Sequence, residues 1–189
     1  MALIYLIRHG KPSSNWGGDD ADPGLDATGE AQAVEVARAL MSRPASERPK
    51  RVVSSPLRRC IETAKPLAEA LGVDIEIDPA VGEIPTPKAL SAAERPAWLR
   101  AAFTGRWRDI QGDLDYDVWR KAVCAAVAAR PATAVFSHFV AINAVLSVLA
   151  GEDQVIGFRP DHTSISTFDL GDDGLTLVER GREASTAVL

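Results

Sequence analysis

The chain has 189 residues, of which 46% are hydrophobic and 25% charged, and its formal net charge is −5. This length and composition predict one globular domain with a buried core. The negative charge argues against general binding to nucleic acid or to acidic membranes. No apolar stretch reaches membrane-spanning length, and residues 3–7 follow no positively charged segment. We therefore expect a cytoplasmic protein without a secretory signal.

Strand-like and helix-like segments alternate along the chain. Residues 3–7 form an uninterrupted apolar run, as in a strand covered on both faces. A helix follows Asp26, with Thr28 as its expected N-cap. Ser55 and Pro56 are expected to cap and start the next helix. Further strands are predicted over residues 51–54, 73–77, 133–137, 165–170 and 175–178, and further helices over 115–129 and 139–150.

This order of elements predicts an α/β fold, with a mainly parallel sheet and helices on both faces. The pattern loosens at about residues 83–115, where prolines and large aromatic residues gather. We expect this stretch to be a small helical cap inserted into a single domain that covers residues 1–189. In such folds ligands bind beyond the carboxyl ends of the strands.

The cysteines and histidines indicate no structural metal. Cys60 and Cys124 lie in helical patterns, so we expect buried thiols rather than a disulfide. His9, His138 and His162 have no metal-ligand spacing, so we expect no structural zinc.

Several basic side chains follow predicted strands. Arg8 and His9 end the first strand, and His138 follows the strand 133–137 at the start of a helix. Arg58 and Arg59 lie at the start of the helix after the second strand. Arginines and helix amides at one sheet edge predict a phosphate pocket, and a neutral histidine among arginines is a usable nucleophile. Taken singly, each residue has an ordinary structural interpretation, but their joint placement favours the pocket.

Four blocks occur in a recognisable order: Arg8-His9-Gly10, DPGLDATGEAQA at residues 22–33, SSPLRRCIETA at 54–64 and VFSHF at 135–139. Together they resemble the histidine phosphatase superfamily, the phosphoglycerate-mutase-like proteins. The second block is similar to the family's pLTxxGxxQA stretch, and the third to its SxLxRAxQTA stretch. That register assigns the pocket arginine to Arg59 rather than Arg58. Asn15 falls where the family's extended opening motif has a phosphate-contacting asparagine.

The resemblance implies a mechanism for a phosphomonoesterase acting on a small phosphorylated metabolite. His9 attacks the phosphorus and becomes a phosphohistidine, which water then hydrolyses. Arg8, Arg59 and His138 hold the phosphoryl oxygens, with Asn15 assisting. The resemblance implies no metal and no organic cofactor.

The family also implies a glutamate early in the cap that protonates the leaving oxygen. Glu83 occupies the matching place, although Pro-Thr-Pro replaces the aromatic-Glu-Gly that often follows. The competing interpretation is an exposed loop carboxylate. Glu76 and Asp78 are weaker candidates for the same role.

Three residues depart from the family pattern or lie near its motifs. Phe139 stands where the family usually has glycine and is expected to narrow the entrance. Asn143 stands where many members have arginine, which we expect to affect packing or specificity. We interpret His162 as structural, with pocket lining as the alternative. Four arginines of the cap are expected to be solvated: Arg95, Arg100, Arg106 and Arg108.

Other functions remain open beside hydrolysis. A phosphoglycerate-type phosphomutase is disfavoured by the short chain, because a mutase must shield its phosphoenzyme from water. A protein phosphohistidine phosphatase is disfavoured by the sizeable cap. A non-catalytic phosphate-binding module is disfavoured because Arg8, His9, Arg59 and His138 are all present. The sequence predicts neither the phosphate ester nor the oligomeric state.

Overall fold

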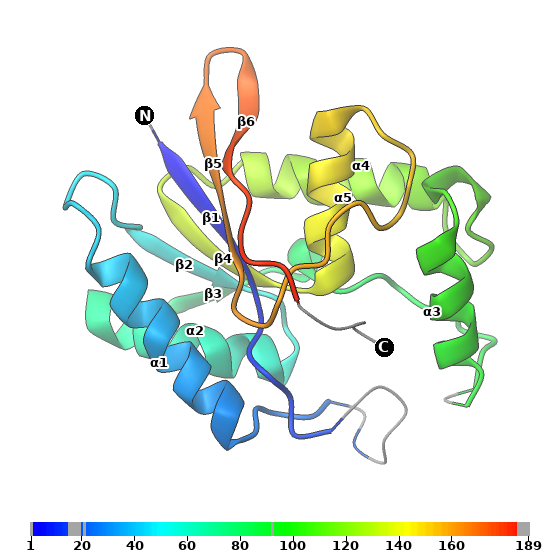
Figure 1. The fold of residues 1–189 in the computed structure, drawn as a ribbon, viewed down its shortest axis with the longest axis horizontal. Helices are drawn as coiled ribbons and strands as arrows, with labels where there is room; N and C mark the ends of the chain where they lie inside the picture. The colour runs from blue at the N-terminus through cyan, green and yellow to red at the C-terminus, as the bar shows by residue number, and fades with distance from the viewer. Residues whose placement is uncertain (1, 15–19, 21, 92, 185–189) are drawn as a thin grey trace.

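The computed structural model describes residues 2–14, 20, 22–91 and 93–184, which form a sheet of strand order β3-β2-β4-β1-β5-β6 (Figure 1). The strands are β1 (Leu3–Arg8), β2 (Arg51–Ser54), β3 (Ile75–Ile77), β4 (Thr133–Ser137), β5 (Ile165–Gly171) and β6 (Gly174–Glu179). The helices are α1 (Ala27–Met41), α2 (Arg58–Leu71), α3 (Arg95–Thr104), α4 (Tyr116–Ala128) and α5 (Phe139–Ala150), with short 3-10 turns η1 (Pro79–Val81) and η2 (Trp107–Asp109).

The sheet is mainly parallel, which confirms the predicted fold class. Strands β1, β2, β3 and β4 pair in parallel, whereas β5 and β6 run antiparallel to their neighbours. Because β5 runs opposite to β1, its first residues lie at the edge where β1 and β4 end. The sequence did not predict this reversal, and it matters for the site described below.

Both faces of the sheet are covered by helices. Ile4 and Leu6 of β1 point into a core shared with α4 and α5, whereas Tyr5 and Ile7 point into a second core shared with α1 and α2. Figure 1 shows these helix pairs on opposite sides of the sheet. Alternate residues of a strand face opposite sides, so an uninterrupted apolar run is what a doubly covered strand requires.

The helix starts differ from the predictions. Asp26, not Thr28, caps α1, because its carboxylate accepts the Gly29 N–H at 2.7 Å. Helix α2 begins only at Arg58, and Ser55 does not cap it. The Ser55 hydroxyl is instead directed at His138.

Two of the helices end at glycine residues. Gly72 ends α2 and Gly151 ends α5, both with φ of 67°, a conformation that glycine adopts without strain. Strand β3 starts at Ile75 rather than at residue 73, because the Val73 N–H still bonds to the Ala68 carbonyl of α2.

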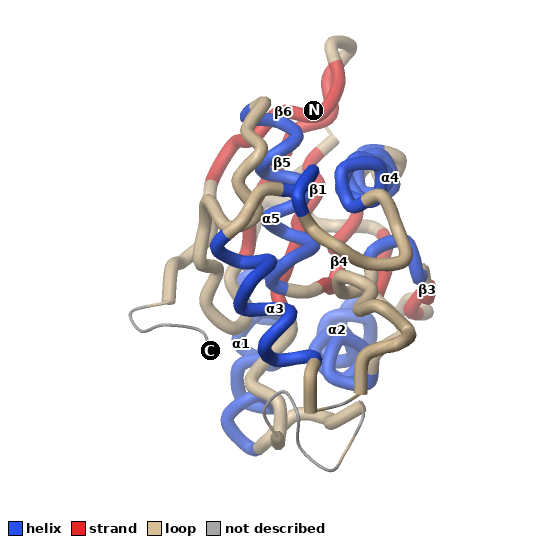
Figure 2. Tube along the Cα trace, turned by 90° about the vertical axis from the view of Figure 1, so that its right-hand side faces the viewer, coloured by secondary structure: helices blue, strands red, loops and turns tan. Residues whose placement is uncertain are grey.

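The segment between β3 and α4 holds only η1, α3 and η2. Figure 1 places α3 on the α5 side of the sheet and apart from α1 and α2, and Figure 2, which looks onto that side, shows α3 in front. Trp107 is fully buried, and its ring lies 5.9 Å from that of Trp119 in α4, so this segment has an aromatic core. The four arginines expected to be solvated here are exposed. Within the described ranges, none of the helices is long and apolar enough to cross a membrane.

Gly29 of α1 is expected to tolerate no side chain. A Cβ there would overlap the Lys11 carbonyl oxygen and lie 3.0 Å from the Lys11 nitrogen. We expect Gly29→Ala to lower the free energy of unfolding by about 1–3 kcal/mol, measured by urea denaturation. Gly171→Ala is the matched control, because a Cβ there meets no atom within 4 Å. Equal stability of both variants would contradict the close approach.

Candidate active site

Four ionisable side chains converge at the carboxyl edge of the sheet. Parallel pairing of β1 with β4 sets Arg8 opposite Ser137, so the residues that follow, His9 and His138, are neighbours. Their ring centroids are 5.3 Å apart. Arg59 enters from the first turn of α2. At least nine tenths of the surface of Arg8, His9, Arg59 and His138 is buried, which is unusual for polar groups without a function.

Gly10 allows the chain to turn immediately after His9. Its N–H donates to the Thr63 hydroxyl at 2.9 Å, and that hydroxyl donates to the Arg59 carbonyl at 2.6 Å. A Cβ on Gly10 would lie 2.8 Å from the Gly29 carbonyl oxygen, so α1 packs directly on the turn. The glycine is therefore required by close packing of three segments.

The ring of His9 is held in one orientation. Its Nδ1 lies 2.8 Å from the Gly10 carbonyl oxygen, which can only accept, so Nδ1 carries the proton. The lone pair of the neutral ring is then on Nε2. Arg59 donates its Nε–H to this atom at 3.3 Å. The unprotonated nitrogen of His9 thus faces Arg59.

Arg59, rather than Arg58, reaches the histidines. Its Nη2 lies 3.3 Å from His138 Nδ1, and its Nη1 lies 3.9 Å from a carboxylate oxygen of Asp22. Arg58 is exposed and pairs with Glu62 at 2.7 Å. The register of the SSPLRRCIETA block therefore agrees with the geometry.

His138 is held from its other side by Ser55. Its Nε2 lies 2.7 Å from the Ser55 hydroxyl and 3.3 Å from the Cys60 sulfur. Because a guanidinium only donates, Nδ1 accepts from Arg59, and Nε2 carries the proton donated to Ser55. Sequence reasoning missed this role of Ser55, since a serine before proline also fits a helix cap. Cys60 is buried as predicted, but it lies against a candidate catalytic ring.

Burial and positive charge keep both rings neutral. Burial, together with the neighbouring His138, Arg8 and Arg59, lowers the pKa of His9 well below its usual value. Burial and the same two arginines lower the pKa of His138. Burial also lowers the pKa of Arg8 to about 10, a value at which the guanidinium remains charged at neutral pH. The cluster therefore combines two cations with two neutral imidazoles.

Glu83 is the acidic group of the cluster. Its carboxylate lies 3.9 Å from His138 Nδ1, and the other oxygen accepts the Ile84 N–H at 3.0 Å. Burial raises its pKa, although the Ile84 N–H and Arg59 oppose the rise. An exposed loop carboxylate is therefore the wrong description of Glu83.

Glu76 and Asp78 serve a different purpose. Both carboxylates pair with Arg130, and Glu76 also pairs with Arg51 at 2.7 Å. The ion pairs with Arg130 and Arg51 lower the pKa of Glu76.

Phe139 packs on the guanidinium group of Arg8. The Arg8 guanidinium carbon lies 5.3 Å from the centroid of the Phe139 ring, a cation–π distance. Phe103 of α3 lies 5.7 Å from the same ring. Arg8 also donates to the Pro160 carbonyl at 2.9 Å. Its buried Nε has no hydrogen-bond partner among the described residues.

Two other predicted residues have different outcomes. Asn15 lies outside the described residues, so its proposed phosphate contact stays a prediction. Asn143 holds a loop: its side-chain oxygen accepts the N–H groups of Gly157 and Phe158 at 3.1 and 3.0 Å. Its amide donates to the Phe139 carbonyl at 3.0 Å. This residue acts in packing.

His162 lies much closer to the cluster than a purely structural histidine would. Its ring centroid is 5.9 Å from that of His9. The residue precedes β5, whose antiparallel direction brings it to this edge. Knowing the direction of β5 would have placed His162 at this edge. The residue pattern of a single strand does not reveal whether it runs parallel or antiparallel to its neighbour.

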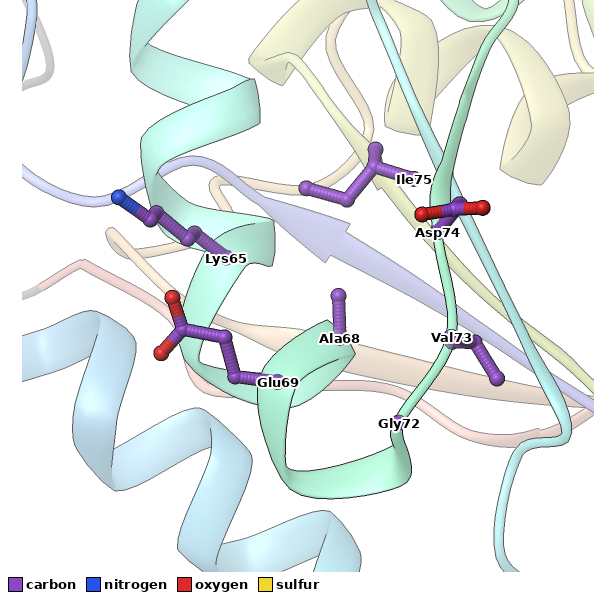
Figure 3. Close-up of a pocket in the computed structure, with 7 residues that line it drawn as sticks. All are labelled: Lys65, Ala68, Glu69, Gly72, Val73, Asp74 and Ile75. Carbon is purple, nitrogen blue, oxygen red and sulfur yellow. The ribbon is translucent and has the colours of Figure 1, made fainter.

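No other described region offers comparable chemistry. Among the described residues, no three His, Cys, Asp or Glu side chains are arranged to hold a metal ion. An open hollow lies at the far end of α2, where its polar side chains are exposed (Figure 3). It is lined by Lys65, Ala68, Glu69, Gly72, Val73, Asp74 and Ile75.

Comparison with known proteins points in the same direction as the geometry. A family model described as "Histidine phosphatase superfamily (branch 1)" matches residues 4–182. A 2,3-bisphosphoglycerate-dependent phosphoglycerate mutase of Thermoplasma acidophilum is 30% identical over 183 residues, covering 90% of this chain and 88% of that protein. Two other curated relatives match only part of this chain. One alignment covers 42% of this chain and 20% of the relative, and the other covers 44% of this chain and 39% of the relative.

Two solved structures share the fold at low sequence identity. The phosphoserine phosphatase of Entamoeba histolytica, in complex with 3-phosphoglyceric acid, superposes with a TM-score of 0.75 and 21% identity, covering 96% of this chain and 98% of that one. A mycobacterial glucosyl-3-phosphoglycerate phosphatase superposes with a TM-score of 0.70 and 18% identity, covering 97% and 100%.

The buried neutral histidines predict loss of stability in acid. The unfolded chain binds protons near pH 6.5 that the folded chain does not, so stability falls as pH drops below that value. Each fully buried histidine contributes up to about 1.4 kcal/mol per pH unit. We expect His138→Asn to have a shallower dependence than the native protein between pH 7.5 and 5.5.

The measurement is urea denaturation in phosphate-free buffer, followed by tryptophan fluorescence. Val34→Ala, at an exposed position of α1, is the control and should keep the native pH dependence. Because Glu83 has a raised pKa, it contributes with the opposite sign, and comparing variants with the native protein largely removes that contribution. An unchanged slope in His138→Asn would show that this ring binds protons as readily in the folded chain as in the unfolded chain.

Proposed function

This chain belongs to branch 1 of the histidine phosphatase superfamily, and we propose that it is a phosphomonoesterase that hydrolyses a small phosphorylated metabolite through a phosphohistidine on His9. The observation that carries the proposal is the buried cluster of Arg8, His9, Arg59 and His138, in which His9 Nε2 is an unprotonated nitrogen beside a guanidinium.

His9 is the nucleophile in this proposal. Its Nε2 forms a bond to phosphorus while the bond from phosphorus to the ester oxygen breaks. The hydrogen bond from Nδ1 to the Gly10 carbonyl stabilises the positive charge that the ring acquires. Water then attacks the phosphohistidine, releasing inorganic phosphate and restoring the neutral ring. Such transfers depend on positioning and electrostatic stabilisation more than on covalent chemistry.

The two arginines and His138 hold the phosphoryl oxygens. The guanidinium groups are buried, so their attraction for a dianion is screened less than at the surface. A bound phosphoryl group also favours protonation of His138 at Nδ1, since a negative charge nearby stabilises the imidazolium. Ser55 keeps accepting from Nε2, and the ring therefore presents its Nδ1 side to the phosphate.

Glu83 is the proposed general acid. Burial raises the pKa of this carboxyl group and so favours its protonated form, which can donate a proton to the leaving alcohol. The resulting carboxylate then accepts a proton from the attacking water. We further propose that residues 83–115 act as the cap that encloses the alcohol part of the substrate, and that the reaction needs no metal.

A phosphomutase is the second candidate. The Thermoplasma acidophilum relative is named a phosphoglycerate mutase, and this chain matches most of its length. Incubation with 3-phosphoglycerate distinguishes the two: a hydrolase releases inorganic phosphate, whereas a mutase forms an isomeric phosphoglycerate.

The first prediction concerns His9 and metal independence. We expect the native protein to hydrolyse p-nitrophenyl phosphate in excess EDTA, and His9→Ala to lose all measurable turnover because the nucleophile is absent. Thermal unfolding followed by circular dichroism checks that the variant is folded. Turnover by the folded variant would exclude His9 as the nucleophile, and loss of native activity in EDTA would exclude a metal-free reaction.

The second prediction concerns Glu83. We expect Glu83→Gln to lower kcat on alkyl phosphates by about 10²–10⁴, since alkoxides leave poorly without a proton. On p-nitrophenyl phosphate the loss should be far smaller, because p-nitrophenolate leaves unaided. Glu76→Gln is the matched control at an exposed carboxylate and should leave both rates unchanged. Equal losses on the two ester types would rule out Glu83 as the acid.

A further inference from the structure

The third histidine of the chain is placed beside the nucleophile by the sheet itself. Strand β1 lies between β4 and β5, and His9 correspondingly lies between His138 and His162. His162 is only partly buried, and its ring nitrogens make no hydrogen bond with any described residue. The ring is therefore close to the reacting group and free to meet a ligand.

A strained turn fixes this position. The Ser164 N–H donates to the Asp161 carbonyl at 3.0 Å, which closes a turn with His162 and Thr163 at its centre. Thr163 has a φ of 58°, a conformation that turns usually assign to glycine and that a β-branched residue rarely adopts. Such strain persists only where the surroundings enforce it.

The surroundings here are the backbone groups of the catalytic strand. The Thr163 N–H donates to the Arg8 carbonyl at 3.1 Å, and the Arg8 N–H donates to the Ser164 carbonyl at 3.1 Å. The Thr163 hydroxyl donates to the His162 carbonyl at 2.6 Å. The turn that carries His162 is therefore bonded directly to the strand that carries Arg8 and His9.

The charges around His162 suit a neutral partner. Burial and Arg8 lower the pKa of His162 to about 4, so the ring is neutral at neutral pH. The Asp161 carboxylate accepts the backbone N–H of His162 at 2.8 Å. Its negative charge would repel a second anionic group of a substrate. The nearby Lys11 is already paired with Asp26 at 2.8 Å. A neutral imidazole offers one donor and one acceptor, which matches a hydroxyl group.

We propose that His162 is a substrate-binding residue that hydrogen-bonds a hydroxyl group on the alcohol part of the ester, and that the enzyme therefore prefers polyol or sugar phosphates. The buried Phe139 ring packs over Arg8 on the α5 side, so we place the alcohol part of the ester on the side of His162. The inference rests on the proposed function, since it assigns the alcohol side of the same reaction.

The test compares sn-glycerol 3-phosphate with n-propyl phosphate, which has the same carbon chain without hydroxyl groups. We expect the native enzyme to favour the hydroxylated ester in kcat/KM by about tenfold or more. His162→Leu should reduce this ratio to near one. His162→Asn, which keeps a donor and an acceptor, should retain most of it, and the exposed-site variant Val34→Ala should match the native ratio.

A binding measurement separates this inference from the proposed function. Titration calorimetry with both esters on His9→Ala, with and without His162→Leu, gives the preference without turnover. A hydroxyl preference that His162→Leu leaves intact, or no preference in the native site, would overturn the role of His162. If the binding preference depends on His162 but the native protein hydrolyses neither ester, the role of His162 is supported and only the phosphatase proposal is overturned.

Discussion

Parallel pairing of β1 with β4 is the constraint on which the candidate site depends. The register that sets Arg8 opposite Ser137 brings His9 and His138 together without any direct bond between them. It does so because both strands end at the same edge and each is followed directly by a histidine. Gly10 then lets the chain leave the edge at once, under a close contact with α1. The positions of the two imidazoles therefore follow from backbone pairing and packing rather than from the side chains themselves.

Electrostatics at this edge follow from burial. Two guanidinium groups and two imidazoles share a volume almost closed to water, so the histidines cannot all be charged beside the arginines. An anion removes that conflict, because it compensates the arginines and favours a proton on His138. Glu83 completes the balance as a carboxyl group whose burial favours its neutral form. The buried positive charge of the two arginines therefore favours a negatively charged ligand.

The sequence was most informative where a motif and a strand end coincide. Arg8, His9, Arg59 and His138 could be placed from pattern and family register, and the alternation of elements was enough for the fold class. It was least informative where one residue type fits two roles. Ser55 before a proline looks like a helix cap, yet its hydroxyl holds His138. His162 looked structural because a strand pattern contains no direction, and only the antiparallel pairing of β5 brings it to His9.

The stacking of Phe103, Phe139 and Arg8 links regions that are remote in the sequence. The ring of Phe139 packs against both the Arg8 guanidinium of β1 and the Phe103 ring of α3. A displacement of α3 therefore changes the packing around Arg8, and a change at Arg8 is felt in α3. The free energy of holding an anion at the sheet edge and the free energy of positioning α3 are in this way thermodynamically linked. The residues of α3 are therefore connected to Arg8 through the Phe139 ring.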